Sequence, residues 1–395
     1  MRIASSLPAL LDATLTWPCQ LRASDPPPEA VLADLPFEGS ERSRVIVDLA
    51  PEGSQPFRLF LDTGASRSVV TPGMARELGV HVRRLKSSPY RRATRLGRDL
   101  QFRVDDRRGD TGSRTGWEYG LLGGDFLAEY VLEIDFPGRR VRFLDPERFE
   151  IPEAIDAEGE AVLPVKLVSS RPAVEIFVEG HPLLVTLDTG APHPAILSAK
   201  VLKKAGLPWS PLGSFEAGTV VGPMKLELAE LGELRLGAFA LGPGFPVFVA
   251  PRGWYNLGIE SESVIGYGLL SSFLVRIDYP HKRLWLRRDP EARITLFGRD
   301  YTEGRRVGVL LARSLASYHA AVVFPGSPAE QRGLRAGDRI ERVGRNPGGL
   351  TERRIVRALA EGVSIGVRRQ IGGESKAVSL EGSDEPSRPP PADWD

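Results

Sequence analysis

The chain has 395 residues, of which 42% are hydrophobic and 26% are charged, and its formal net charge is +1 at pH 7. This length suits two or three domains of globular composition, and the balanced charge gives no global field that would attract nucleic acid or an anionic membrane. A single cysteine, Cys19, and only 5 histidines argue against a disulfide framework and against a zinc site.

Residues 1–37 are interpreted as an N-terminal arm. They make a poor secretory signal, because the apolar core is short and Asp12 interrupts it. No stretch of the chain approaches the roughly 18 apolar residues of a membrane-spanning helix, so we expect no membrane span. The cytoplasm is then the default compartment, and the bacterial envelope is the alternative.

Residues 38–295 contain one sequence pattern twice. "LFLDTGASRSVV" starts at Leu59 and "VTLDTGAPHPAIL" starts at Val185, so the two Asp-Thr-Gly-Ala motifs are 126 residues apart. Each motif is followed by an apolar-apolar-Gly phrase, and then by a strand, a tight turn and a returning strand that ends in Asp-Pro. Matching phrases that recur in the same order indicate a duplication. We therefore predict two β-rich units, residues 38–150 and residues 151–295.

Short strands dominate both units. Runs such as "SRVIVDL", "VLPVKLV" and "FPVFVA" are separated by Gly or Pro, which is typical of an all-β barrel or sandwich. Brief helices are predicted at Pro72–Leu78 and Ala199–Ala205, soon after each motif. Residues 82–114 carry 11 Lys or Arg but only 2 aromatic residues, which favours a solvated hairpin face over a nucleic-acid surface.

A third region spans residues 298–381. Its pattern is strand, strand, short helix, strand, helix and hairpin. The tail, residues 382–395, is rich in proline and acidic residues and is predicted to be disordered.

The repeated motif has a chemical meaning. An aspartate at the end of an apolar strand presents its carboxylate at the edge of a core, and the glycine lets the backbone turn tightly. Two such carboxylates, related by pseudo-symmetry, can face each other between the units. They cannot both ionise cheaply, so the pair shares one proton. One member then acts as a general base on a water molecule and the other acts as an acid.

The two units resemble the halves of a retropepsin-like aspartic protease. The resemblance is carried by the paired motifs and by the phrases Leu121-Leu122-Gly123 and Val264-Ile265-Gly266. It implies a mainly β, bilobal acid-protease (retropepsin- or pepsin-like) β-barrel fold in which water is the nucleophile and neither cofactor nor metal is needed. The residues that it implies are the catalytic pair Asp62 and Asp188, the threonines Thr63 and Thr189 that exchange hydrogen bonds, and the glycines Gly64 and Gly190 beside the carboxylates.

Each half of this family can also contribute a flap over the substrate. In the second unit the stretch Glu216–Leu228 looks like one, and its flap residues are Gly218, Thr219, Val220 and Gly222. In the first unit the equivalent is placed at Ser87–Gly97, where Tyr90 is the candidate that covers substrate. One departure from the repeat is Pro192, which stands where the first unit has Ser66. Three further aspartates of the repeat are expected to serve turns or ion pairs: Asp125, Asp135 and Asp278.

The third region resembles a small α+β PDZ domain of bacterial proteases. The phrase "PGSPAEQRGLRAGDRIERVGRNP", Pro325–Pro347, carries this resemblance. It implies that peptides or protein C-termini bind as an added strand, with their carboxylate in a loop placed at Gly304–Val309 and with the helix Glu352–Ala360 beside the groove. The alternative is a packing module without a ligand.

The sequence thus predicts a single-chain aspartic endopeptidase that acts on polypeptides. Because one chain holds both aspartates, we expect a monomer. One alternative is a protease-fold protein that binds peptides or serves as a scaffold without turnover. A third possibility is an enzyme that cleaves only its own N-terminal arm, which would give a product that starts before Ser40.

Overall fold

The structure is a computed structural model, and it describes residues 25–39, 43–49, 56–77, 90–93, 99–104, 120–155, 157–219, 222–251, 263–296, 299–314, 317–345, 349–371, 374–380 and 382. Val220, residues 1–24 of the predicted arm and residues 383–395 of the predicted tail lie outside this set. In the described part of the chain, no helix is long and apolar enough to cross a membrane.

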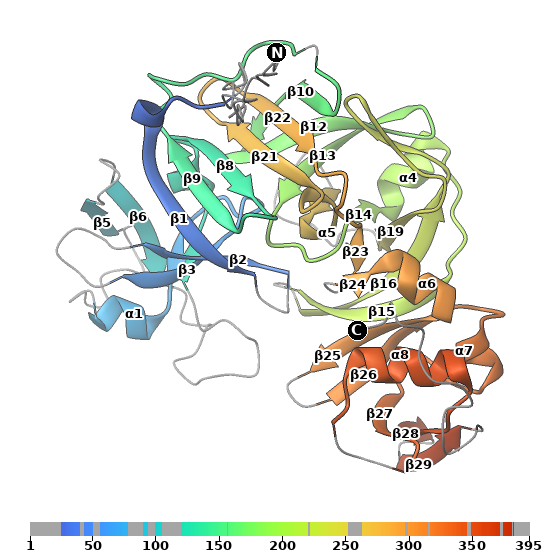
Figure 1. Cartoon of the computed structure of the whole chain (residues 1–395). Helices are drawn as coiled ribbons and strands as arrows, with labels where there is room; N and C mark the ends of the chain where they lie inside the picture. Colours follow the sequence, from blue (N-terminus) through green and yellow to red (C-terminus); the bar gives the residue numbers. More distant parts are fainter. Residues whose placement is uncertain are drawn as a thin grey trace, which may run out of the picture.

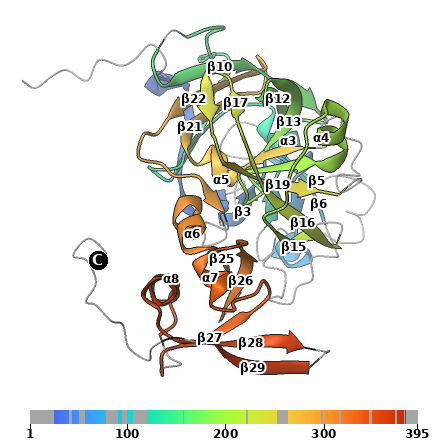
Figure 2. The same ribbon diagram turned by 90° about the vertical axis from the view of Figure 1, so that its right-hand side faces the viewer.

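The prediction of a mainly β protein is confirmed (Figures 1 and 2). We call residues 31–144 lobe 1. Its strands are β1 (Val31–Gly39), β2 (Val45–Leu49), β3 (Phe57–Leu61), β4 (Val69–Val70), β5 (Tyr90–Ala93), β6 (Asp99–Val104), β7 (Gly120–Leu122), β8 (Val131–Asp135) and β9 (Arg140–Leu144), and its helices are α1 (Pro72–Glu77) and α3 (Gly124–Leu127).

We call residues 160–288 lobe 2. Its strands are β10 (Glu160–Pro164), β11 (Lys166–Val168), β12 (Arg171–Val178), β13 (His181–Asp188), β14 (Ala195–Ser198), β15 (Gly213–Thr219), β16 (Gly222–Leu231), β17 (Leu234–Leu236), β18 (Phe239–Leu241), β19 (Phe245–Ala250), β20 (Val264–Gly266), β21 (Phe273–Asp278) and β22 (Arg283–Arg288), and its helices are α4 (Ala199–Ala205) and α5 (Tyr267–Leu270).

The two lobes share one sheet of 12 described strands, in the order β10-β22-β21-β8-β9-β1-β2-β3-β7-β4-β6-β5. The lobes join in this sheet at the antiparallel pair β8–β21, in which Asp135 lies opposite Leu274, Glu133 opposite Arg276 and Val131 opposite Asp278. A second sheet, β15-β16-β19-β14-β20-β13-β12-β17-β18, belongs to lobe 2 alone, and β11 pairs with β12. The duplicated strand pairs therefore meet at the middle of the molecule.

The predicted arm extends too far into the fold. Residues 28–30 form a 3-10 helix, η1 (Pro28–Ala30), and β1 then runs between β9 and β2. The sequence hides this strand because its exposed face carries the apolar Leu32 and Pro36, so that no regular apolar–polar alternation is visible. Lobe 1 thus begins before residue 38.

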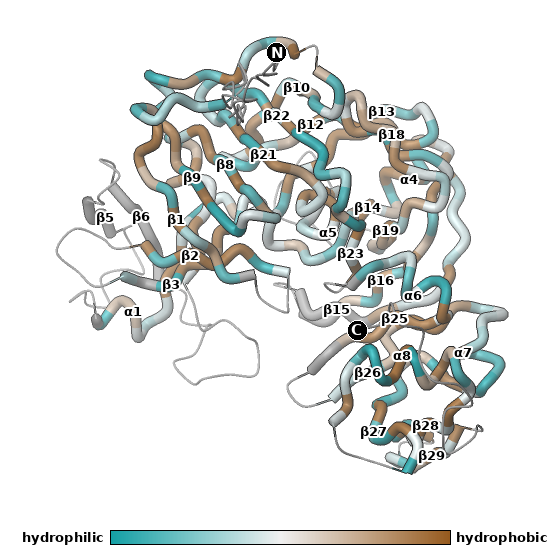
Figure 3. The backbone as a smooth tube through the Cα atoms, viewed as in Figure 1, coloured by the Kyte–Doolittle hydropathy of each residue, from teal (hydrophilic) through white to brown (hydrophobic). Residues whose placement is uncertain are grey.

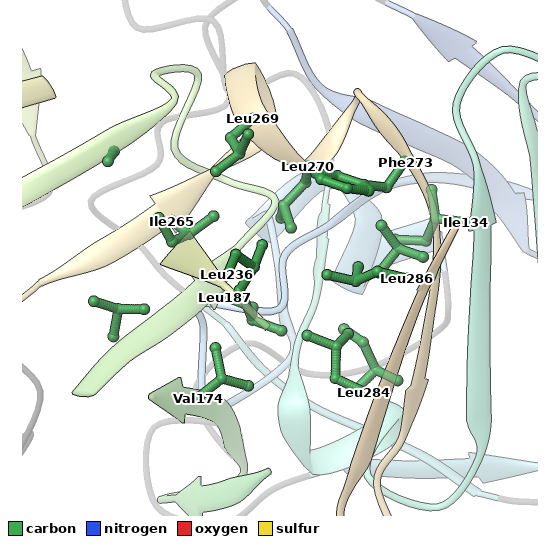
Figure 4. Packing of buried hydrophobic residues seen from close by; sticks show 14 of the residues in the cluster. Ile134, Val174, Leu187, Leu236, Ile265, Leu269, Leu270, Phe273, Leu284 and Leu286 are labelled. Atoms are coloured by element: carbon green, nitrogen blue, oxygen red, sulfur yellow. The ribbon is translucent and has the colours of Figure 1, made fainter. Parts of the chain in front are cut away.

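One apolar core lies inside both lobes. Leu187, which directly precedes Asp188, packs in Figure 4 against Leu236, and Ile134 of lobe 1 lies beside Leu286 of lobe 2. The tube in Figure 3 is brown over parts of β8 and β21, and the apolar residues of these strands are largely buried. Removal of this apolar surface from water, worth about 25 cal/mol per Å², holds the two lobes as one body.

Residues 301–380 follow a short hairpin, β23 (Thr295–Leu296) and β24 (Arg299–Asp300), and we call them the C-terminal unit. Its elements are α6 (Tyr301–Val307), β25 (Val309–Ser314), β26 (Ser317–Val323), α7 (Pro328–Gln331), β27 (Arg339–Val343), α8 (Glu352–Glu361), β28 (Ile365–Ile371) and β29 (Glu374–Leu380), and its strands lie in the order β25-β26-β27-β28-β29.

Local sequence signals fix the helices of this unit. The Glu330 amide donates to the Ser327 hydroxyl at 3.2 Å, and the Arg354 amide donates to the Thr351 hydroxyl at 3.2 Å, so both residues are N-caps. The loop predicted at Gly304–Val309 is wrong. This stretch is the end of α6 and the start of β25, because Asp300 caps the helix at its N-terminus and Gly308, with φ +92°, ends it.

Candidate active site

Both motif aspartates stand at the ends of apolar strands. β3 ends at Leu61 and β13 ends at Asp188, and each strand pairs in parallel with the short strand of the downstream phrase, β7 or β20. The amide of Asp62 donates to the carbonyl of Leu122 at 3.0 Å. These buried ladders carry the two carboxyl groups to equivalent positions in the two lobes.

The glycine of each apolar-apolar-Gly phrase has a steric reason. A Cβ atom on Gly123 would lie 2.6 Å from the carbonyl oxygen of Arg67, and one on Gly266 would lie 2.3 Å from the carbonyl oxygen of His193. The loop that follows each aspartate packs directly over this position, so no side chain fits there. The glycine of each phrase therefore marks a close contact between the short strand and the motif loop.

The two threonines cross-link the loops. The Thr63 amide donates to the Thr189 hydroxyl at 3.1 Å, and the Thr189 amide donates to the Thr63 hydroxyl at 3.1 Å. Each hydroxyl also donates across the junction, Thr63 to the Leu187 carbonyl at 2.7 Å and Thr189 to the Leu61 carbonyl at 2.8 Å. Both threonines are buried, so four satisfied hydrogen bonds hold the loops in one geometry.

The glycines bring the carboxyl groups together. The Gly64 amide donates to Asp62 Oδ1 at 2.9 Å, and the Gly190 amide donates to Asp188 Oδ1 at 2.8 Å. A Cβ atom on Gly64 would lie 2.3 Å from Cγ of Asp188, and one on Gly190 would lie 2.8 Å from Cγ of Asp62. Each glycine thus faces the carboxyl group of the opposite lobe, where only a residue without a side chain fits.

The electrostatics follow from this proximity. Burial, together with the charge of the neighbouring Asp188 carboxylate and a hydrogen bond to it, raises the pKa of Asp62 well above the ordinary carboxyl value. Burial also raises the pKa of Asp188, and hydrogen bonds from Gly190, from Asp62 and from Ala191 oppose that rise. Such a pair holds one shared proton at pH values where a lone carboxyl group is ionised.

The loops keep the same backbone support in both lobes, despite Pro192. The Gly124 amide donates to the Ala65 carbonyl at 2.8 Å, and the Tyr267 amide donates to the Ala191 carbonyl at 2.7 Å. The missing N–H group of Pro192 therefore leaves this shared hydrogen bond intact.

The other repeat aspartates stabilise loops and turns. Asp125 accepts hydrogen bonds at 2.7 Å from both the amide and the hydroxyl of Ser68, close to the first motif. Asp135 accepts from the Gly138 amide at 2.9 Å, and Asp278 accepts from the His281 amide at 3.0 Å. These contacts agree with the turn role that was expected for the three residues.

The predicted second-lobe flap is a hairpin. β15 and β16 pair along their length, with Gly218 opposite Pro223 and Thr219 opposite Gly222. Thr219 and Gly222 are the last paired residues, and Val220 lies outside the described residues.

The sheet order relates the predicted first-lobe flap to the hairpin of lobe 2. In lobe 2, β14 pairs in parallel with β19, and β19 pairs with the flap strand β16; in lobe 1, β4 pairs in parallel with β6, and β6 pairs with β5. Tyr90, in β5, therefore stands on the equivalent of the second flap strand. Of the stretch Ser87–Gly97, only Tyr90–Ala93 is described, so the flap of lobe 1 stays a prediction.

His193 is a feature of the site that the sequence did not single out. Its ring lies 4.5 Å from that of Phe248 and 6.2 Å from that of Phe215 in β15, so the second motif loop packs on the flap strand. Burial lowers the pKa of His193 to about 3, which keeps the ring neutral over the range where carboxyl groups titrate. The signal that was available was a histidine directly between Pro192 and Pro194 in the motif loop.

Comparison with known proteins gives weak similarities. No protein-family model and no curated protein matches the chain. Among solved structures, a retropepsin-like aspartic protease from Rickettsia conorii is 19% identical, with 33% of this chain and 91% of that chain covered and a TM-score of 0.25. Basic 7S globulin from soybean is 11% identical, with 64% and 93% covered and a TM-score of 0.37.

The EIAV protease, complexed with the inhibitor HBY-793, is 18% identical, with 25% of this chain and 85% of that chain covered and a TM-score of 0.21. TM-scores this low leave the fold and the chemistry of the chain to be inferred from its own geometry.

Proposed function

We propose that the protein is an aspartic endopeptidase whose catalytic groups are Asp62 and Asp188. The observation that carries this proposal is the reciprocal threonine–glycine arrangement, which holds two carboxyl groups against each other at the junction of the lobes. Structural ion pairs perturb pKa values too, but two carboxyl groups held against each other repel when both are ionised, so their pairing opposes stability.

The mechanism follows from one shared proton. A water molecule between the carboxyl groups gives a proton to the ionised member and attacks the carbonyl carbon of the scissile peptide bond. The protonated member donates its hydrogen bond to the carbonyl oxygen, where negative charge develops. Transfer of a proton to the leaving nitrogen then breaks the C–N bond and regenerates the pair. No covalent enzyme intermediate, metal or cofactor takes part.

The rigidity of the loops supports this assignment. The attacking water must stay aligned with both carboxyl groups, and misplacement by about 1 Å costs on the order of 100-fold in rate. Thr63 and Thr189 oppose such movement, because each is bonded to both the backbone and the hydroxyl group of the opposite lobe. Both aspartates come from one chain, so the proposed enzyme is complete as a monomer.

The test is peptide cleavage. The purified chain is incubated with a denatured protein mixture from about pH 3 to pH 8, beside Asp62→Asn and Asp188→Asn, and new peptides are identified by mass spectrometry. Asp135→Asn is the matched control, because Asp135 bonds only to its own turn at Gly138 in the described contacts. Cleavage by the native chain and the control alone, blocked by a statine-type inhibitor, is the expected result. Equal products from all four proteins would refute the proposal, and none from any would favour the peptide-binding alternative.

We further propose that each repeat forms one domain, lobe 1 or lobe 2, and that the C-terminal unit is a PDZ-like domain. The supporting features are the sheet with β25 at one end of the strand order, the Ser327 cap of α7, and the helix α8. An extended peptide or a protein C-terminus would add to the outer edge of β25. Screening a fluorescent peptide library against the full chain tests this, and the absence of any bound peptide would contradict it.

A further inference from the structure

The C-terminal unit packs on the root of the flap hairpin, not on the outside of the lobes. We call this contact the flap seam. The seam is formed by five buried residues, each at most 2% exposed: Leu226 and Leu228 of β16, Leu310 of β25, Val322 of β26, and Phe324. Figures 1 and 2 both show β15 and β16 lying against the C-terminal unit.

The contact is tight at the first residue of the hairpin. A Cβ atom on Gly213 would lie 2.6 Å from Cγ1 of Val322, closer than van der Waals contact permits. Gly213 lies opposite Leu228, so this point is where the hairpin leaves the body of lobe 2. The C-terminal unit therefore contacts the place about which the hairpin would bend.

A polar group closes the edge of the seam. Glu230, in β16, accepts a hydrogen bond from the Tyr301 hydroxyl and a second one from Arg305 Nε at 3.0 Å. The Arg305 guanidinium also lies 4.7 Å from the centre of the Phe324 ring, so the cation is fixed from two sides. Charge-assisted hydrogen bonds of this kind are stronger than neutral ones.

The hairpin needs this support. β16 pairs with β19 only from Glu227 to Leu231, whereas its other half pairs with β15 alone. A two-stranded ribbon is marginally stable in water unless it packs on a further layer. At the root of the hairpin, β19 pairs with one edge and the C-terminal unit covers one face. The half of the hairpin beyond β19 is therefore held in place only through its root.

The seam also reaches the catalytic loop. Ala191, which follows Asp188-Thr189-Gly190, belongs to the same apolar cluster, and His193 packs on Phe215 and Phe248 of the same face. On the other side of the contact, the residues flanking Leu310 point into the C-terminal core. One strand of the C-terminal unit thus touches both its own core and the flap root.

We propose that the C-terminal unit is a positioning clamp for the flap of lobe 2, in which Tyr301 and Arg305 act through Glu230. The expected effect on kinetics rests on the proposed endopeptidase function, whereas the restraint on the motion of β15 and β16 does not. Loosening the clamp frees the hairpin, weakens the hold on a bound polypeptide, and leaves the Asp62–Asp188 pair unchanged.

The first test is hydrogen exchange of the full chain. The double variant Tyr301→Phe, Arg305→Gln is compared with Arg235→Gln, which removes an exposed ion pair with Glu233 in the same lobe. Amides of residues 213–231 are expected to exchange about tenfold faster in the double variant, and the control is expected to match the native chain. Unchanged exchange in the hairpin, or an equal increase over the whole chain, would overturn the proposal.

The second test uses the steric contact. Gly213→Ala is expected to speed exchange of the hairpin, and the added substitution Val322→Ala is expected to reverse much of this effect by making room for the new methyl group. Because the two residues lie in different units, such a rescue reports their contact directly. No effect of Gly213→Ala, or no rescue, would contradict the clamp.

The kinetic readout separates positioning from chemistry. In the Tyr301→Phe, Arg305→Gln variant, KM for a cleaved peptide is expected to rise about tenfold, with the pH limits of kcat unchanged. A loss of kcat at unchanged KM would overturn the positioning role. If no substrate is cleaved by the native chain, the exchange experiments still decide the clamp, and the endopeptidase proposal fails alone.

Discussion

The pair Glu133–Arg276 makes the junction between the lobes specific. The two residues lie opposite each other in β8 and β21, and the register around them is symmetric, because Asp135 and Asp278 occupy equivalent places in the repeat. They therefore sit on the pseudo-two-fold axis. In a pairing of two like lobes, the residue on the axis would face its own copy, carboxylate against carboxylate or guanidinium against guanidinium.

The pair is almost completely buried. Glu133 is 1% exposed and Arg276 is 2% exposed, and Arg276 Nε donates to Glu133 Oε2. Arg142 donates to the other carboxylate oxygen at 2.8 Å, and the Arg276 guanidinium lies 4.2 Å from the centre of the Trp285 ring. Each partner is thus held by its own lobe as well as by the other one.

We expect Arg276→Glu and Glu133→Arg each to lower the free energy of unfolding by about 3–5 kcal/mol, the cost of leaving a buried charge without its partner. Against a typical total of about 5–15 kcal/mol, either change removes a large share of the stability. The double reversal restores opposite charges but sets Arg142 against the new arginine, so we expect incomplete recovery and a coupling energy of about 2–3 kcal/mol.

The assay is urea unfolding of the four proteins, followed by the fluorescence of tryptophan, since Trp285 stacks on the mutated position. Arg235→Gln is the matched control, because it breaks an exposed ion pair with Glu233, and such pairs contribute only about 0–1 kcal/mol. Additive effects without coupling, or single reversals that cost less than about 1 kcal/mol, would refute the account of the junction.

Three further predictions concern the active site. Because the folded-state pKa of Asp62 is raised, the native chain loses stability as pH rises through that pKa, by about 1.4 kcal/mol for each pH unit between the unfolded-state and folded-state values. The variant Asp62→Asn should therefore melt at a higher temperature than the native chain at pH 7 and at the same temperature near pH 3. Melting temperatures that differ by the same amount at every pH would contradict this. The effect of His193 on stability has the opposite dependence on pH: burial lowers its pKa to about 3, so the native chain loses stability as pH drops below about 6.5. The variant His193→Phe should therefore show a melting temperature that depends less on pH between about 6.5 and 3. An unchanged slope would count against the buried neutral ring. Gly64→Ala should lower kcat/KM by about 100-fold or more, because its Cβ atom would lie 2.3 Å from Cγ of Asp188, and near-native activity in a peptide assay would mean that the carboxyl groups are not so placed.

The sequence predicted what the repeat itself encodes. The Asp-Thr-Gly-Ala motifs, the strand after each of them, and the helices near Pro72 and Ala199 all appear where local pattern placed them. These features depend on alternation, on turn residues and on internal repetition, which can be read from one stretch of chain at a time.

Pairings between distant segments were not predictable in this way. The strand β1 escaped notice because Leu32 and Pro36, on its exposed face, interrupt the apolar–polar alternation, and its burial comes from its partners β9 and β2. The place of Tyr90 relative to lobe 2 follows from the sheet order, which the sequence does not show. The stretch Gly304–Val309 was assigned as the carboxylate-binding loop from the resemblance to PDZ domains, whereas it holds the end of α6 and the start of β25.

The clamp at the flap root had no sequence signal at all. Tyr301 and Arg305 lie 71 and 75 residues after Glu230 in the sequence, and none of the three residues belongs to a recognisable motif. Only the packing of the C-terminal unit on β15 and β16 brings them together, which is a tertiary property of the fold.

The central claim is that Asp62 and Asp188 act as one unit with one shared proton. The most direct measurement is kcat/KM for a single cleaved peptide against pH, from about pH 2 to pH 8, for the native chain, Asp62→Asn and Asp188→Asn. The account predicts a bell-shaped profile for the native chain, with its upper limb above the ordinary carboxyl pKa, and no cleavage by either variant at any pH. Cleavage by either variant at a rate close to that of the native chain would contradict it.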